Sequence, residues 1–184
     1  MNKMIISVLG KDQPGILAAV SRVLLDQECN IENVSQTILQ NTFGAILVVS
    51  APDNADEKSL RDKLLSGVTH LNLDIFVKQV DNQNTNFEEP VSHPFVITTV
   101  GPDKYGLVAA ITSILAKYSV NVTNLQAVFK GGSDPQSNIM IFETSVPAEI
   151  DLPSLVKELE QCAQELELEI NIQHRKIFET MNRI

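Results

Sequence analysis

Apolar and polar positions along the chain predict alternating strands and helices. Residues 4–9 are an apolar run rich in Ile and Val that stops at a glycine, which is typical of a buried strand. A loop over 10–15 follows, and residues 16–27 show helical periodicity with one apolar face. That face consists of Ile16, Leu17, Val20, Val23 and Leu24. We expect Asp12 to cap this helix and Pro14 to lie in its first turn.

Two strands, a helix and a last strand are predicted next. Residues 31–39 and 43–50 are strands separated by a polar pair, which indicates a hairpin. The second of these strands is apolar on both faces, so it should be central in its sheet. A charged helix is expected over 56–65. In the strand at 71–77, apolar residues alternate with polar ones except at Phe76.

The same pattern returns 91 residues later. Residues 10–38 align with 101–129 without a gap, and eight of the 29 aligned positions are identical. The second copy therefore predicts the same elements at 95–100, 105–118, 122–130, 139–146, 151–168 and 169–174. Its hairpin turn, 130–137, is longer than the first, and we interpret it as a flexible surface loop or a partner-contact loop.

The repeat and the element order together predict the fold class. Each copy has the order β-α-β-β-α-β, which is typical of a ferredoxin-like α+β domain: a four-stranded antiparallel sheet with two helices on one face. We expect domain 1 over 1–80, a polar linker over 81–92, domain 2 over 93–176 and a tail over 177–184. The other face of each sheet would be bare, which favours a homo-oligomer or packing between the domains.

The bulk composition argues against several classes of function. The 184 residues are 43% hydrophobic and carry a net charge of −9 that both halves share. No stretch concentrates Lys or Arg, so direct nucleic-acid binding is disfavoured. No apolar run reaches the roughly 18 residues of a membrane helix, and the first residues form a strand rather than a signal peptide. We therefore expect a cytoplasmic protein with no membrane partner.

Catalytic and metal chemistry has little support in the sequence. His70, His93 and His174 are scattered and match no metal spacing, and no serine or cysteine has a histidine–acid set beside it. Cys29 and Cys162 occupy non-equivalent places in the repeats, which favours reduced and mostly buried thiols. We predict no enzyme activity, no metal and no cofactor.

The loop at 10–15 is the strongest candidate binding site. It opens a helix, where unpaired N–H groups and the helix dipole favour an anion such as the carboxylate of an amino acid. Gly15 lets a ligand approach the backbone closely, and Asp12 offers an acceptor for an ammonium group. Asn30 and Asn33 carry donors and acceptors that would complete the pocket. The candidate ligand-binding residues are Asp12, Gln13, Pro14, Gly15, Asn30 and Asn33 in the first copy, and Asp103, Gly106, Asn121 and Asn124 in the second.

Structural roles explain many of the same residues. The two aspartates suit helix capping, the two glycines suit close helix–sheet packing, and the first asparagine of each copy suits a left-handed turn residue after a helix. The asparagines at 33 and 124 lie inside strands, so they indicate a shared structural bond or a shared contact. In the second loop, Lys104-Tyr105 replaces Gln13-Pro14, so we expect ligand binding more in the first copy.

The run Gly10–Ile16, with Asn30-Ile31 opening the second strand, resembles the ACT domain. The second copy has Tyr105 where the proline should be. It keeps Gly101, Asp103, Gly106 and Asn121-Val122. The resemblance covers essentially the whole chain, and it implies binding of a small ligand, mostly an amino acid, and regulation of metabolic enzymes or transcription.

Tandem ACT chains of this length resemble the glycine cleavage system transcriptional repressor group, and the run Cys29–Asn33 is similar to that group. The resemblance implies an amino-acid-responsive regulator of glycine and one-carbon metabolism. Its partners would be a separate transcription regulator and a small amino acid, glycine or serine. Two alternatives stay open: a ligand-free tandem interaction module, and a regulatory subunit of an amino-acid metabolic enzyme.

Overall fold

The chain forms two compact units, residues 1–87 and 88–184, which we call the N-terminal and C-terminal units. The computed structural model describes residues 2–80, 91–128 and 138–176. Most of the predicted linker, the long hairpin turn at 130–137 and the predicted tail lie outside the described residues.

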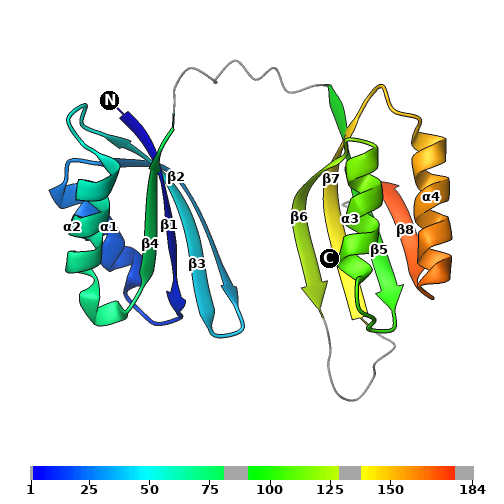
Figure 1. Ribbon diagram of the computed structural model, residues 1–184, viewed down its shortest axis with the longest axis horizontal. Coiled ribbons are helices and arrows are strands. Elements are labelled where there is room, and N and C mark those ends of the chain that lie inside the picture. The colour runs from blue at the N-terminus through cyan, green and yellow to red at the C-terminus, as the bar shows by residue number, and fades with distance from the viewer. Residues whose placement is uncertain (1, 81–90, 129–137, 177–184) are drawn as a thin grey trace. The chain divides into compact units, whose positions relative to one another are not determined.

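The N-terminal unit is a four-stranded antiparallel sheet with two helices on one face (Figure 1). The strand order is β2-β3-β1-β4, so β3 and β1 are central, as the apolar character of β3 predicts. The elements are β1 (Asn2–Lys11), α1 (Ile16–Asp26), β2 (Asn30–Leu39), β3 (Thr42–Ala51), α2 (Glu57–Gly67), a 3₁₀ turn (Thr69–Leu71) and β4 (Asp74–Gln79).

The C-terminal unit repeats this architecture with the strand order β6-β7-β5-β8. Its elements are β5 (Ser92–Gly101), α3 (Leu107–Lys117), β6 (Asn121–Val128), β7 (Asn138–Pro147), α4 (Leu152–Glu165) and β8 (Glu169–His174). Both units show the β-α-β-β-α-β order, so the predicted tandem ferredoxin-like fold is confirmed.

Strict alternation along the central strands separates a core face from an outer face. On β1, Met4, Ile6 and Val8 are at most 2% exposed, whereas Ile5 and Leu9 are 36% and 50% exposed on the opposite face. The core side chains pack against α1 and α2 through Ile16, Val20, Leu24, Leu60 and Leu64. The helices therefore cover one face of the sheet and leave the other bare.

The predicted helix caps are wrong in both units. The N-cap residues of α1 and α3 are Gly15 and Gly106, and no side chain caps either helix. Asp12 and Asp103 lie three residues before these glycines, which is too early for their carboxylates to cap the first turn. Pro14 likewise precedes the helix instead of lying in its first turn.

The last strand of the first copy begins later than predicted. The apolar alternation from residue 71 onward indicated a strand over 71–77, but residues Thr69–Leu71 form a 3₁₀ turn and β4 begins at Asp74. Leu71 and Leu73 are nevertheless buried in the core. The alternation therefore predicted the buried residues correctly, although Leu71 is buried from a 3₁₀ turn and not from a strand.

Candidate functional site

The loop between β1 and α1 is open, and so is the equivalent loop between β5 and α3 in the C-terminal unit. Gly15 and Gly106 adopt left-handed backbone conformations, with φ of 95° and 87°. A Cβ built on either glycine would meet no atom within 4 Å, so the prediction that these glycines allow close helix–sheet packing is wrong. Glycine is needed here for its backbone conformation, and the space in front of it is free.

The helices that follow these loops have unsatisfied first turns. No side chain caps α1 or α3, whereas Asp56 and Asp151 cap α2 and α4 by accepting hydrogen bonds from the N–H groups of Ser59 and Ser154 at 2.9 and 3.3 Å. The first N–H groups of an uncapped helix require solvent or a ligand as acceptor. Among the four α-helices of the described residues, the two without a side-chain cap are the two that begin at the predicted binding loops.

The chain around each loop is fixed by neighbouring segments. Gln13 Nε2 donates to the carbonyl oxygen of Leu71 at 2.9 Å, and the N–H of Asp12 donates to the carbonyl oxygen of Asn41 at 2.8 Å. In the C-terminal unit, Lys104 replaces Gln13 and pairs with Glu167 at 3.1 Å. Gln13 therefore has a structural partner, and the open part of the site is the turn that contains Gly15.

The structure does not bring Asn30 and Asn33 to this loop, which corrects our expectation that they complete its pocket. Asn33 pairs with Val48 of β3, which pairs with Ile5 of β1. Ile5 lies six residues before the end of β1, so the asparagine is about 20 Å from the loop at roughly 3.4 Å per residue. Whether either place binds a ligand stays a prediction.

At the end of each sheet where these asparagines lie, a polar cluster is found on the face opposite the helices. Glu32 accepts a hydrogen bond from Ser50 Oγ and forms an ion pair with Lys3 at 3.0 Å. These two groups hold the pKa of the Glu32 carboxyl below its ordinary value. In the C-terminal unit, Asn124 Nδ2 donates to Glu143 Oε1 at 3.0 Å. Asn124 therefore has a structural bond within its own unit.

The asparagines that open β2 and β6 are not left-handed turn residues. Asn30 and Asn121 are exposed and already lie in strands. The left-handed residues at the two helix exits are Glu28 and Ser119, with φ of 55° and 56°. The turn role that we predicted for the asparagines is therefore wrong, and it falls two residues earlier in each unit.

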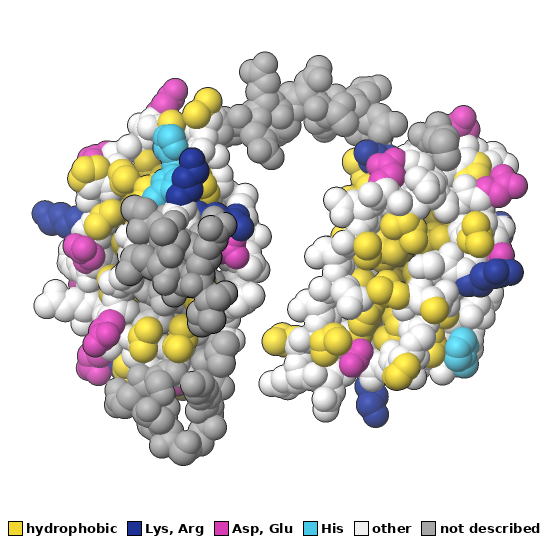
Figure 2. Space-filling view, turned by 180° about the vertical axis from the view of Figure 1, so that it is seen from behind, with side chains coloured by type: hydrophobic (Ala, Val, Ile, Leu, Met, Phe, Trp, Pro, Cys, Tyr) yellow, Lys and Arg dark blue, Asp and Glu magenta, His cyan; other side chains and the backbone are white. Residues whose placement is uncertain are grey.

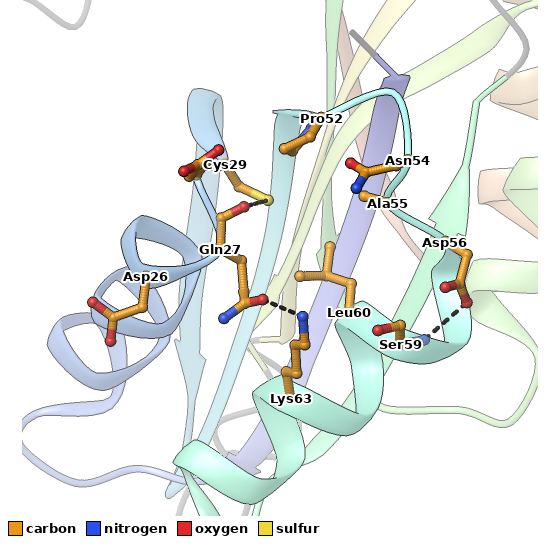
Figure 3. Close-up of a pocket in the computed structure, with 11 residues that line it drawn as sticks. Asp26, Gln27, Cys29, Pro52, Asn54, Ala55, Asp56, Ser59, Leu60 and Lys63 are labelled. Atoms are coloured by element: carbon orange, nitrogen blue, oxygen red, sulfur yellow. Dashed lines mark hydrogen bonds between the residues drawn. The ribbon is translucent and has the colours of Figure 1, made fainter.

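A polar pocket that the sequence did not predict lies between the end of α1 and the start of α2 (Figure 3). Gln27 Oε1 accepts a hydrogen bond from Lys63 Nζ at 2.5 Å, and Asp56 is held by its bond from Ser59. Burial raises the pKa of the Cys29 thiol, and the charge of Lys63 offsets part of the rise. The pocket joins residues from two distant segments, so no local sequence pattern could predict it.

The described residues hold no group of three or more His, Cys, Asp or Glu side chains arranged for a metal ion. Burial and the nearby carboxylates of Glu165 and Glu158 raise the pKa of the Cys162 thiol. Raised thiol pKa values disfavour the thiolate that a cysteine nucleophile needs.

Within the same described ranges, no helix is long and apolar enough to cross a membrane.

The C-terminal core contains two polar atoms with no partner among the described residues. Thr99 Oγ1 and Asn138 Nδ2 are unpaired, and their residues are 0% and 4% exposed. In the N-terminal unit the equivalent positions are apolar. Val8 aligns with Thr99 in the repeat. Phe43 corresponds to Asn138, because each pairs with the glycine that ends the first strand of its unit. The second core is therefore less well satisfied than the first.

Replacing Thr99 by valine should raise the stability of the C-terminal unit by about 1 kcal/mol, because it removes an unpaired buried hydroxyl at nearly constant shape. Urea unfolding followed by tyrosine fluorescence measures this, since Tyr105 and Tyr118 are the only tyrosines and the chain has no tryptophan. Thr144→Val is the matched control: its Oγ1 donates to the carbonyl oxygen of Phe95 at 3.1 Å, so it should lose stability. Equal losses in both variants would show that Thr99 has a partner.

Comparisons with known proteins support one family for both units. A UPF0237 protein of Methanopyrus kandleri is 33% identical over 82 residues, which is 44% of this chain and 91% of that protein. A solved structure of an unknown protein from Galdieria sulphuraria is similar with a TM-score of 0.75 at 22% identity, over 94% of this chain and 98% of that one. A “putative glycine cleavage system transcriptional repressor” is similar with a TM-score of 0.69 at 18% identity, over 94% and 96%. The sequence model of the ACT domain matches residues 2–78 and again 93–173, so this chain belongs to the ACT domain family.

Proposed function

We propose that this chain is an amino-acid-responsive regulatory protein that acts through protein–protein contact, in transcriptional regulation of glycine and one-carbon metabolism. The observation that supports the ligand-binding part of the proposal is the pair of open loops before α1 and α3, each ending at a left-handed glycine in front of an uncapped helix. The fold similarity to a repressor-like tandem protein is compatible with this role.

The loop suits the two charged ends of an amino acid. The first-turn N–H groups of α1 and the helix dipole favour a carboxylate in front of Gly15. The exposed carboxylate of Asp12 is a nearby acceptor for the ammonium group. Exposed Pro14 and a glycine without side chain leave little apolar surface for a large side chain, which favours glycine or serine as the ligand.

Ligand binding would act on a partner through unequal affinity for two states of the protein. If the loop binds the amino acid only in the state that contacts the partner, the ligand raises partner affinity; the opposite preference lowers it. The acidic chain, with a net charge of −9, makes a protein partner more suitable than DNA itself. We therefore place the transcriptional effect in a separate regulator.

The first alternative is a ligand-free interaction module, which the bare apolar sheet face of the N-terminal unit favours. The second is a regulatory subunit of an amino-acid metabolic enzyme, which the family membership allows equally. Affinity capture with the full chain distinguishes them. A transcription regulator, a metabolic enzyme or an amino-acid-independent partner would each support a different function.

Thermal unfolding against a panel of amino acids tests the proposal. Glycine or serine should raise the midpoint by several degrees, because a ligand that binds only the folded state adds about 2.7 kcal/mol at a hundredfold excess over Kd. Glycinamide lacks the carboxylate and N-acetylglycine lacks the ammonium group, so both should have no effect. The absence of any shift at millimolar concentrations of every amino acid would contradict the sensor function.

A further inference from the structure

The bare face of the N-terminal sheet carries an exposed apolar patch, Ile5, Leu9, Ile46 and Phe76, which we call the outer patch. These side chains are 36%, 50%, 55% and 69% exposed. Figure 2 shows hydrophobic side chains gathered on the surface of this unit. A depression of about 400 Å³ lies on the same face, lined by side chains that include Leu9, Ile46 and Phe76. Monomers rarely leave such a contiguous apolar surface uncovered.

Strand register fixes the arrangement of the outer patch. Ser7 of β1 pairs with both Phe76 of β4 and Ile46 of β3, and Ile46 pairs with Ser35 of β2. These four residues therefore form one straight row across the sheet, which we call the central row. Ile5 and Leu9 lie two residues before and two residues after Ser7 on β1, on the same face of the sheet.

The equivalent face of the C-terminal unit differs. Val96 takes the place of Ile5 and is only 3% exposed, and Asn171, which pairs with Thr98, takes the place of Phe76. Arg175 extends from the end of β8 and pairs with Glu143 of β7 at 3.4 Å. At these described positions, the N-terminal unit therefore exposes apolar side chains where the C-terminal unit has a buried valine and a polar asparagine.

Two opposite charges flank the central row on the edge strand. Asp74 pairs with Leu9, and Lys78 pairs with Ile5, so both point to the bare face and stand two residues on either side of Phe76. Both side chains are exposed. A rotation of 180° about an axis along the central row reverses the strand direction. This rotation exchanges the positions of Asp74 and Lys78.

We propose that the outer patch is covered by the outer patch of a second copy of this chain, related by a two-fold axis along the central row. Phe76 then packs against Phe76 of the second copy, and Asp74 of each copy faces Lys78 of the other. The interface is isologous, as closed dimers require. Charge complementarity favours a second copy as the partner, because the rotation places each Asp74 opposite a Lys78.

Sedimentation equilibrium of the full chain tests the apolar part of this interface. The wild type is expected to be a dimer, and Phe76→Asp should raise the dimer dissociation constant by about 100-fold or more, because each dimer loses a central aromatic contact and gains two buried charges. Leu25→Asp is the matched control: Leu25 is 64% exposed on α1, away from the bare face, and should leave the dimer unchanged. Circular dichroism checks that both variants remain folded.

Charge reversal tests the two-fold register. Asp74→Lys and Lys78→Asp should each weaken the dimer by about tenfold at low salt, because each creates two like-charge pairs across the axis. The double variant restores opposite pairs and should recover the wild-type dissociation constant. A monomeric wild type, a dimer unaffected by Phe76→Asp, or a double variant as weak as the two single variants would each overturn the proposal.

Discussion

Replacing Gly101 by alanine is expected to destabilise the C-terminal unit by about 2–3 kcal/mol. An added Cβ would lie 2.8 Å from the carbonyl oxygen of Glu167, 2.7 Å from Leu168 Cδ2 and 3.2 Å from Leu168 Cα. Two of these three atoms are backbone, so the turn before β8 must move as a whole. The glycine at this position of the repeat is therefore required by the close approach of the chain that enters the last strand.

The equivalent glycine of the first copy provides an internal comparison. A Cβ on Gly10 would meet Leu73 Cδ2 at 2.6 Å, but the nearest backbone atom, the carbonyl oxygen of Asn72, would be 3.4 Å away. A leucine methyl group can move by rotating its side chain. We therefore expect Gly10→Ala to cost less than about 1 kcal/mol, clearly below its counterpart.

Urea unfolding measures both changes in the full chain. Tyrosine fluorescence follows the C-terminal unit alone, because Tyr105 and Tyr118 both lie there, and far-ultraviolet circular dichroism follows both units. Gly44→Ala is a suitable control, since its Cβ would have only ordinary contacts at 3.8 and 3.9 Å. Equal losses for the changes at 10 and 101 would show that the backbone contact at Glu167 does not determine the cost.

The second large effect concerns the candidate site: Gly15→Asp should weaken binding of a small amino acid by at least about tenfold. The new carboxylate would stand where the ligand carboxylate is expected, in front of the first turn of α1. Two like charges about 4 Å apart repel by roughly 1–4 kcal/mol between water and a partly shielded surface, and 1.4 kcal/mol is a tenfold change in affinity.

Gly15→Asn isolates the charge. Aspartate and asparagine have nearly the same shape, and both tolerate a left-handed backbone better than most residues, so both variants carry similar strain at a φ of 95°. The asparagine variant should keep most of the ligand-induced rise in the unfolding midpoint, whereas the aspartate variant loses it. If both variants respond like the wild type, the ligand does not bind at this loop.

The fold was predictable because the sequence contains the same pattern of elements twice. The alternation on β1 and β3 fixes which side chains enter the core, and the second copy repeats the order of elements without a gap over 29 positions. Independent repetition removes much of the ambiguity of short apolar runs. Phe76, which interrupts the alternation of its strand, was one visible sign of the outer patch, and the apolar character of both faces of residues 43–50 was another.

The candidate site was only partly predictable, for a geometric reason. Asn30 follows Gly15 closely in the chain, but α1 lies between them, and a helix of 11 residues carries the chain about 16 Å to the other end of the sheet. We expected Asn30 to lie near Gly15 because the two are close in sequence, but α1 separates them in space. The caps failed differently, because a left-handed glycine took the N-cap position that the pattern assigned to Asp12.

A nuclear magnetic resonance titration of the ¹⁵N-labelled full chain with glycine and serine shows residue by residue whether the first loop binds an amino acid. We expect saturable shifts of the backbone amide signals of Gly15, Ile16 and Leu17, with smaller or no shifts at Gly106, where the loop has Lys104-Tyr105. Signals of the α1–α2 pocket should stay in place. An absence of shifts at Gly15 up to millimolar ligand, or shifts confined to that pocket, would contradict an amino-acid sensor built on the first loop.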